Sequence, residues 1–299
     1  MTTPNVLEYG LPPKGYRLPD ASRLGAVRLQ ISDLARSLAW YQSVLGLEVM
    51  EKTATTASLA VEGALSPLIE LREKKGINPV PRGGLLGLYH YAVLLPDRFA
   101  LGRFIGHLAT LGMHAGMSDH FVSEAVYIDD PDGLGIELYA DRPRAAWTHE
   151  NRQLTMASLP LDARALVEAA GGRPWTGLPN GTVIGHVHLH VGDIDRASAF
   201  YHDLIGFDKT VWNYPGALFM SAGGYHHHLG TNIWAAQSPP ASENDAKLIE
   251  WEIVVPTVAD VGRVEANVKQ GGNAADREGA AVLLRDPWGT TVRVIPSVA

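Results

Sequence analysis

Residues 24–47, LGAVRLQISDLARSLAWYQSVLGL, and residues 184–207, IGHVHLHVGDIDRASAFYHDLIGF, are two copies of one pattern at a constant offset of 160. Each copy opens with apolar residues at alternate positions, which predicts a strand with one buried face. An aspartate then precedes apolar residues at helical spacing, and the run ends at a glycine, so each copy predicts a strand followed by a capped helix. The predicted helix-capping residues are Asp33, Gly46, Asp193 and Gly206.

A second and weaker pair of repeats follows the first. Residues 88–96, LYHYAVLLP, correspond to residues 248–256, LIEWEIVVP, at the same offset. Each precedes a predicted helix and then an Asp-Pro-x-Gly turn that leads into a short strand. The chain therefore consists of four modules of strand, helix and further strands. The modules begin near residues 24, 88, 184 and 248, the later helices are expected at 98–111 and 257–269, and the turns lie at 130–133 and 286–289.

The repeats divide the chain into two halves. A polar stretch with several Pro and Gly residues separates modules 2 and 3, and we expect one short helix in it, at 162–170. The predicted organisation is an N-terminal arm at 1–21, a first domain with modules 1 and 2 at 22–145, a linker at 146–181, and a second domain with modules 3 and 4 at 182–299.

The amino-acid composition excludes several kinds of metal site and binding partner. The 299 residues include no cysteine and twelve histidines, so disulfides and thiolate metal sites are excluded and a metal would have to bind imidazole and carboxylate groups. A net charge of -7 argues against a nucleic-acid partner. No apolar run approaches the ~20 residues of a membrane span, and the first residues lack a signal-peptide pattern, so a cytoplasmic protein without a membrane partner is expected.

The four modules, together with the HVHLHVGD and DPDGLGIEL stretches, resemble the vicinal oxygen chelate superfamily from residue 22 to 296. That superfamily includes glyoxalases, fosfomycin- and bleomycin-resistance proteins and extradiol dioxygenases. The resemblance implies an α+β fold in which four βαβββ modules form two curved mixed β-sheet domains with the helices outside. It also implies that metal ligands come from the first and last strands of paired modules.

The family's ligand positions can be compared module by module. The first-strand positions hold Ala26, His90, His186 and Glu250, and the last-strand positions of modules 2 and 4 hold Glu137 and Arg293. Only the pairing of modules 2 and 3 gives a complete set, His90, His186 and Glu137; in the remaining pair Arg293 is expected to neutralise Glu250. Glu137 also lies in an apolar strand, where an unpaired carboxylate would be costly, so a cation nearby is expected. Two histidines and one carboxylate form the facial triad of non-haem Fe(II) oxygenases, and Mn(II) would fit the same ligands.

The stretch His120 to Glu137, HFVSEAVYIDDPDGLGIE, resembles the extradiol dioxygenase signature. The resemblance implies that Tyr127 hydrogen-bonds the substrate hydroxyl and that His120 lies close to the substrate. A family acid/base histidine stands three residues before a small residue, which indicates His227, three before Gly230, with His228 as the alternative. A histidine with an ordinary pKa near ~6.5 can take up and return a proton at neutral pH.

The resulting hypothesis is an Fe(II)-dependent extradiol dioxygenase of the catechol 2,3-dioxygenase type, which opens the ring of an aromatic diol with O2. Two alternatives share the fold: a metal-dependent glyoxalase or fosfomycin-resistance-type enzyme, and a drug-binding protein of the bleomycin-resistance kind. The alternating His188 and His190 are expected to line the pocket or to be merely polar, and Glu70 is expected to be structural. The sequence leaves open which diol binds and whether identical chains associate.

Overall fold

The computed structural model describes residues 9–297; residues 1–8 of the predicted arm and the last two residues of the predicted second domain lie outside the described residues. Four βαβββ modules follow one another, as the repeats predict. Modules 1 and 2 comprise β1 Arg23–Ile31, α1 Leu34–Trp40, η1 Tyr41–Leu45, β2 Glu48–Lys52, β3 Thr56–Ala60, β4 Ile69–Glu73, β5 Gly87–Leu94, α2 Arg98–Thr110, β6 Gly116–Asp119, β7 Ser123–Asp129 and β8 Gly135–Asp141. Modules 3 and 4 comprise β11 Val183–His190, α4 Ile194–Ser198, η3 Ala199–Ile205, β12 Asp208–Val211, β13 Ala217–Ser221, β14 Leu229–Asn232, β15 Lys247–Val255, α5 Val258–Gln270, β16 Asp276–Glu278, β17 Ala281–Arg285 and β18 Thr291–Pro296.

The predicted helix caps are confirmed. The Asp33 side chain accepts a hydrogen bond from the backbone N–H of Arg36, and Asp193 does the same three residues before Arg196. Gly46 and Gly206 end the helices with positive φ angles of 68° and 103°, in the left-handed region that glycine adopts without steric cost. One feature was not predicted: each helix widens at its C-terminal end into a π-helical segment, η1 and η3.

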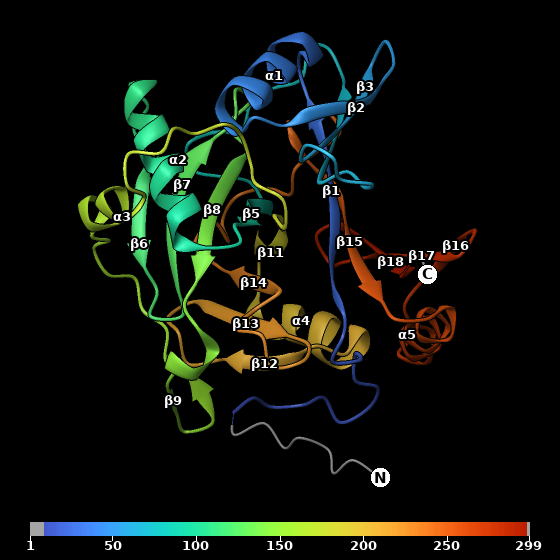
Figure 1. Cartoon of the computed structure of the whole chain (residues 1–299). Coiled ribbons are helices and arrows are strands. Elements are labelled where there is room, and N and C mark those ends of the chain that lie inside the picture. The colour runs from blue at the N-terminus through green and yellow to red at the C-terminus, as the bar shows by residue number, and fades with distance from the viewer. Residues whose placement is uncertain (1–8, 298–299) are drawn as a thin grey trace.

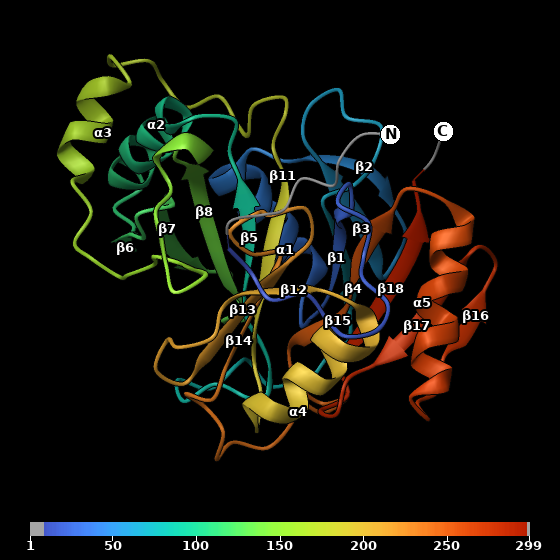
Figure 2. The ribbon, with the colours of Figure 1, turned by 90° about the horizontal axis from the view of Figure 1, so that it is seen from below.

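The two large sheets have eight strands each, and each takes one module from each half of the chain. One sheet, here called the 2/3 sheet, has the order β12-β13-β14-β11-β5-β8-β7-β6. The other, the 1/4 sheet, has the order β16-β17-β18-β15-β1-β4-β3-β2. In both, two modules meet through antiparallel first strands, β11 with β5 and β1 with β15. The predicted boundaries at 22–145 and 182–299 therefore divide the chain by sequence order, whereas the sheets combine modules across that division (Figure 2).

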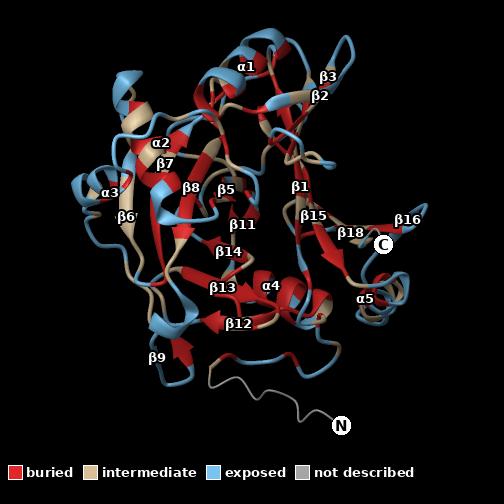
Figure 3. Ribbon diagram, in the orientation of Figure 1, coloured by how far each residue is buried: buried red, intermediate tan, exposed pale blue. Residues whose placement is uncertain are grey.

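The helices cover the outer sides of the two sheets. In Figure 1, α2 lies against β7 and β8, and α5 lies beside β17 and β18. The sheets touch each other through their central strands, β1 with β11 and β5 with β15. Figure 3 shows buried residues along the strands of both sheets and on the inner helix faces, and exposed residues on the outer helix faces and loops. This alternation is expected of a sheet and an amphipathic helix that share one apolar core.

The segment between the two halves of the chain contains secondary structure and packs against the 2/3 sheet. It contains the short helix α3 Ala163–Ala169, close to the predicted 162–170, and also η2 Arg144–Ala146, β9 His149–Glu150 and β10 Gln153–Leu154. Leu159 exchanges two backbone hydrogen bonds with Asp119 at the end of β6, so residues before α3 extend along the edge of the 2/3 sheet.

The described part of the predicted arm packs on the protein. Leu11 exchanges backbone hydrogen bonds with Lys209 on β12, and Leu18 is buried. Within residues 9–297, none of the helices combines the length and the hydropathy that a membrane crossing requires.

Candidate metal centre

Three side chains converge on the concave face of the 2/3 sheet. The Nε2 atoms of His90 and His186 lie 3.0 and 3.1 Å from the same oxygen, Oε2 of Glu137. The three potential ligand atoms lie within 4.8 Å of one another, and all three residues are buried. The predicted ligand set is therefore assembled at one point.

Strand register explains the convergence. His186 on β11 is paired with Ala92 on β5, and Ala92 is paired with Glu137 on β8. Residues in register across neighbouring strands point to the same side of a sheet, so these three form one row, and His90 stands two positions before Ala92 on the same face. The fully buried Ala92 is the smallest member of the row and lies under the point at which the ligands meet. A bulkier residue there would fill this space.

The ionisation of the cluster suits a cation. Burial lowers the pKa of His186 from 6.5 to about 4, so its imidazole is neutral at neutral pH and has a lone pair to share. Burial alone would raise the pKa of Glu137, but the charges and hydrogen bonds of His186 and His90 hold it well below its ordinary value. A neutral imidazole and an ionised carboxylate are the forms in which these groups bind metals.

Two buried ring nitrogens of the cluster, His90 Nε2 and His186 Nδ1, have no hydrogen-bond partner among the described residues, and the first of them faces the other ligands. His90 Nε2 is buried and makes no well-directed hydrogen bond with the described residues, although it lies 3.0 Å from Glu137 Oε2. A buried nitrogen without a partner is costly. A divalent ion between the three groups would satisfy both His90 Nε2 and the Glu137 carboxylate. The cluster therefore fits a metal bound by two imidazoles and one carboxylate.

The equivalent place on the 1/4 sheet holds no such cluster among the described residues. There Arg28 lies between two carboxylates: its Nε donates to Glu70 Oε2 at 2.6 Å, and a terminal nitrogen donates to Glu250. Arg293 Nε also donates to Glu250, at 2.6 Å. Guanidinium groups thus neutralise the acidic residues of this sheet, which confirms the predicted pairing of Arg293 with Glu250 and agrees with a structural role for Glu70.

A fourth ligand position can be located from the register. In module 2, Glu137 is paired with Ala92, which stands two residues after His90. In module 3, the residue two after His186 is His188, and it is paired with Gly230 on β14. Gly230 is therefore the counterpart of Glu137. A glycine provides no ligand, and a Cβ at Gly230 would lie 2.9–3.0 Å from the His188 ring. The register therefore supplies three protein ligands, and the fourth position of the repeat is filled by the neighbouring imidazole ring.

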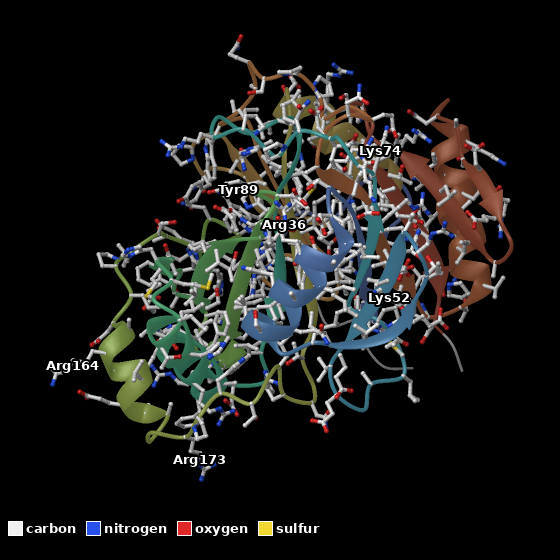
Figure 4. The ribbon with its side chains drawn as sticks, turned by 90° about the horizontal axis from the view of Figure 1, so that it is seen from above. Arg36, Lys52, Lys74, Tyr89, Arg164 and Arg173 are labelled. Atoms are coloured by element: carbon white, nitrogen blue, oxygen red, sulfur yellow. The ribbon has the colours of Figure 1, made fainter. Side chains whose placement is uncertain are left out.

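A cavity of about 420 Å³ opens above the cluster. This volume lies in the range of pockets for small molecules. Aromatic and sulfur-containing side chains dominate its outer wall: Tyr89, Met117, Met156, Tyr214, Phe219 and Trp234. Among the described residues, no lysine or arginine lines it. The arginines of the α3 region, Arg164 and Arg173, extend away from the body of the molecule, whereas Tyr89 lies nearer its centre (Figure 4).

Tyr127 and His120 form one hydrogen-bonded pair in the cavity wall. His120 Nε2 lies 2.6 Å from the Tyr127 hydroxyl, and His120 Nδ1 lies 2.6 Å from the carbonyl oxygen of Ala157. A carbonyl can only accept, so Nδ1 carries the proton, and in a neutral His120 Nε2 accepts from Tyr127. Burial and the nearby Glu137 carboxylate raise the pKa of Tyr127 well above 10, which keeps this hydroxyl protonated.

The two candidate acid/base histidines have different surroundings. His227 lines the cavity, and its ring centroid lies 4.1 Å from that of His186. Burial and the neighbouring histidines lower the pKa of His227 well below 6.5. His228 is not among the cavity-lining residues; its Nδ1 accepts a hydrogen bond from the backbone N–H of Ala222. The geometry thus favours His227 for contact with a bound molecule.

His188 and His190 are both linked to Asn232. His190 Nδ1 donates to Asn232 Oδ1 at 2.7 Å, and the amide nitrogen of Asn232 lies 3.0 Å from His188 Nε2. His188 lines the cavity and is flanked by Tyr89 and Trp234. The pocket-lining interpretation is therefore confirmed for His188.

Several contributors were absent from the sequence-based set. Ala92 and Gly230 matter because they are small, and Ala157 contributes only a carbonyl, so none carries a chemical signal in the sequence. Met156 and Ala157 come from the segment predicted to be a linker. In the sequence, Gly230 stands out only as the small residue three after His227, and the strand register adds that it is the counterpart of Glu137.

Comparison with known proteins is consistent with this site. The model of the glyoxalase/bleomycin resistance protein/dioxygenase superfamily matches residues 23–138 and 183–294. The catechol-2,3-dioxygenase of Bacillus subtilis strain 168 is 43% identical over 270 residues, which cover 89% of this chain and 94% of that protein.

Solved structures share the fold at low identity. A presumed dioxygenase of Bacillus subtilis strain 168 superposes with a TM-score of 0.64 and 13% identity, covering 95% of this chain and 87% of that chain. Glyoxalase I from Zea mays superposes with a TM-score of 0.54 and 17% identity, covering 92% of both chains. Such levels of identity establish the fold alone.

Proposed function

Because the chain belongs to the glyoxalase/bleomycin resistance protein/dioxygenase superfamily, we propose that it is an Fe(II)-dependent extradiol dioxygenase that opens the ring of a catechol with O2. The observation that carries the proposal is the three-ligand cluster of His90, Glu137 and His186 beneath an aromatic cavity. The relative named catechol-2,3-dioxygenase supports it. Bound Fe(II), or Mn(II) in its place, would supply open coordination positions for a diol and O2 and a path for electrons from the diol to O2.

The side chains around the cluster suit the proton transfers of this reaction. His227 faces the cavity beside His186 and is neutral, so it can accept a proton from a diol hydroxyl and return it during ring opening. Tyr127, whose hydroxyl stays protonated, donates that proton to His120 Nε2, so its oxygen is held in place to accept a hydrogen bond from a substrate hydroxyl. The aromatic wall excludes water and packs against the ring.

The cavity favours a diol without a negatively charged substituent. No lysine or arginine among the described residues lines it, and burial lowers the pKa of its histidines His186, His188 and His227. A carboxylate on the ring would be buried without a cationic partner, which is costly. We therefore propose catechol or an alkyl- or aryl-substituted catechol as the substrate.

The geometry disfavours the two alternative functions. A glyoxalase-type site would use a fourth protein ligand, and Gly230 stands at the position that would supply it. A drug-binding protein without a catalytic metal would not need two histidines and a carboxylate buried together. A cytoplasmic location, a role in the breakdown of aromatic compounds and the association of identical chains stay predictions.

The test is anaerobic reconstitution with Fe(II) or Mn(II), followed by addition of catechol and oxygenated buffer. We expect one O2 consumed for each catechol and a yellow ring-opened product, with protocatechuate, which carries a carboxylate, turned over far more slowly. A His186→Ala variant serves as the control and should lose both metal and activity. Bound metal without turnover of any diol would refute the proposed function. Equal turnover of catechol and protocatechuate would refute only the substrate preference.

A further inference from the structure

A chain of hydrogen bonds leads from the cavity to the end of β8. His227 Nδ1 lies 2.7 Å from Nδ1 of His226, and His226 Nε2 lies 2.9 Å from Oδ1 of Asp141. His226 is fully buried, and the side chain of Asp141 is 26% exposed. We propose that Asp141 and His226 are positioning residues that fix the tautomer of His227, and this inference rests on the proposed function of His227 as the proton acceptor.

The donors and acceptors along this chain follow from the carboxylate. An ionised carboxylate only accepts, so His226 Nε2 carries a proton and donates it to Asp141. A neutral His226 then has a lone pair on Nδ1, and the short Nδ1 to Nδ1 contact requires that His227 Nδ1 carries the proton between them. His227 Nε2 is consequently left with a lone pair. The described residues offer that nitrogen no hydrogen bond, and His227 lines the cavity.

His226 stands between His227 and Asp141 and is not among the residues that line the cavity. Its ring centroid lies 6.2 Å from that of His186 and 4.6 Å from that of His227. His226 thus lies farther from His186 of the cluster than His227 does, since the ring centroids of His227 and His186 are 4.1 Å apart. Without these partners, the imidazole of His227 could adopt either neutral tautomer. The hydrogen bonds from His227 to His226 and from His226 to Asp141 select the tautomer in which Nε2 of His227 is unprotonated.

Neighbouring residues hold both members of the relay. Thr210 Oγ1 donates to the carbonyl oxygen of His226 at 2.6 Å and fixes the backbone there. The Tyr225 hydroxyl donates to Asp141 Oδ1 at 3.2 Å, and the Tyr139 hydroxyl lies 2.7 Å from that of Tyr225. These bonds leave the carboxylate little freedom to turn away from His226. Such support is typical of groups that orient an acid/base histidine.

The test compares Asp141→Asn with Asp141→Glu in the Fe(II)-loaded enzyme. The asparagine is nearly isosteric, but its NH2 group can donate to His226 Nε2 and reverse the order of donors along the chain. We expect kcat for catechol to fall by about 100-fold or more, within the range that a general base contributes, with KM and metal content unchanged. Asp141→Glu retains a carboxylate and should recover much of the loss. Asp208→Asn is the matched control and should change kcat little, because this buried carboxylate on β12 accepts from Arg17 and belongs neither to the cavity lining nor to the relay.

A second measurement determines the tautomer of His227 without requiring catalytic turnover. Nitrogen-15 NMR of the histidine rings in the Zn(II)-loaded protein distinguishes protonated from unprotonated nitrogens. We expect His227 to carry its proton on Nδ1 in the unmodified protein and on Nε2 in Asp141→Asn. An unchanged tautomer in a folded, metal-loaded Asp141→Asn protein would overturn the relay, whatever happens to kcat. If the unmodified enzyme does not turn over any diol, the proposed function fails, and the tautomer measurement still decides on the relay.

Discussion

Replacing Glu137 by glutamine tests the metal centre most directly, because the change keeps the shape of the side chain and removes its charge. Glu137 Oε2 is the atom that both histidine nitrogens approach, at 3.0 and 3.1 Å, and the side chain is buried. Two unit charges 4 Å apart interact by about 4 kcal/mol at an effective dielectric constant near 20. A metal ligand lies closer than that to a divalent ion, so about 4 kcal/mol is a lower bound on the loss.

A loss of about 4 kcal/mol weakens metal binding by about 1000-fold. At a free metal concentration of 100 times the Kd of the unmodified protein, binding stabilises the native state by about 2.7 kcal/mol, whereas the variant gains only about 0.06 kcal/mol at the same concentration. For a chain of this size, about 1 kcal/mol corresponds to roughly 2 °C in Tm, so the shift with metal should fall from about 5 °C to less than about 0.5 °C.

The assay is thermal unfolding with and without Fe(II) under anaerobic conditions, or with Mn(II) in air. Without metal, Glu137→Gln should unfold at a lower temperature than the unmodified protein, because the depressed pKa of Glu137 means that its ionised form stabilises the native state at neutral pH. The metal-dependent shift is therefore measured against the metal-free Tm of each protein. Glu250→Gln in the 1/4 sheet is the matched control: it breaks ion pairs with Arg28 and Arg293 but should leave the metal-dependent shift intact. An unchanged metal-dependent shift in Glu137→Gln would refute the proposed metal centre.

Three further predictions concern pH, backbone packing and the cavity wall. Burial raises the pKa of Asp130 to about 7, so its contribution to stability is present below pH ~4 and is lost as the pH rises to ~7. In urea unfolding, the difference in stability between Asp130→Asn and the unmodified protein should therefore shift in favour of the variant by a few kcal/mol between pH ~5 and pH ~7.5. Parallel pH curves for the two proteins would contradict this. A Cβ at Gly135 would lie 2.2 Å from the Tyr89 carbonyl oxygen, so Gly135→Ala should lower the free energy of unfolding by about 1–3 kcal/mol. The control is Gly106→Ala in α2, where no atom lies within 4 Å of the added Cβ, and this change should raise the free energy of unfolding by about 0.5–1 kcal/mol. Tyr127→Phe should lower kcat/KM for catechol about tenfold, the worth of one lost hydrogen bond, and an unchanged value would remove Tyr127 from the mechanism.

Local patterns in the sequence specify the modules and the identity of the ligands. The 160-residue offset locates four strand-helix units, and the capping residues Asp33 and Gly46 define where one helix begins and ends. These features are local, because a cap or an alternating apolar face depends on neighbours within a few positions. Chemically distinctive residues such as His90 and Glu137 can therefore be assigned to their strands from the sequence.

The combination of the modules and the surroundings of the cluster depend on the tertiary structure. Modules 1 and 2 lie in different sheets, and so do modules 3 and 4, because β5 pairs with β11 and β1 with β15. Pairing between distant strands depends on their register and on packing between faces, which no local pattern encodes. Some residues contribute to the site only through their position in the fold and match no recognisable motif. They are the small residues Ala92 and Gly230, which leave space beside the cluster, and Asp141, whose carboxylate lies behind His226. For that reason the sequence identifies the candidate metal ligands, whereas the fold determines the shape and charge of the cavity and the hydrogen bonds that hold His227.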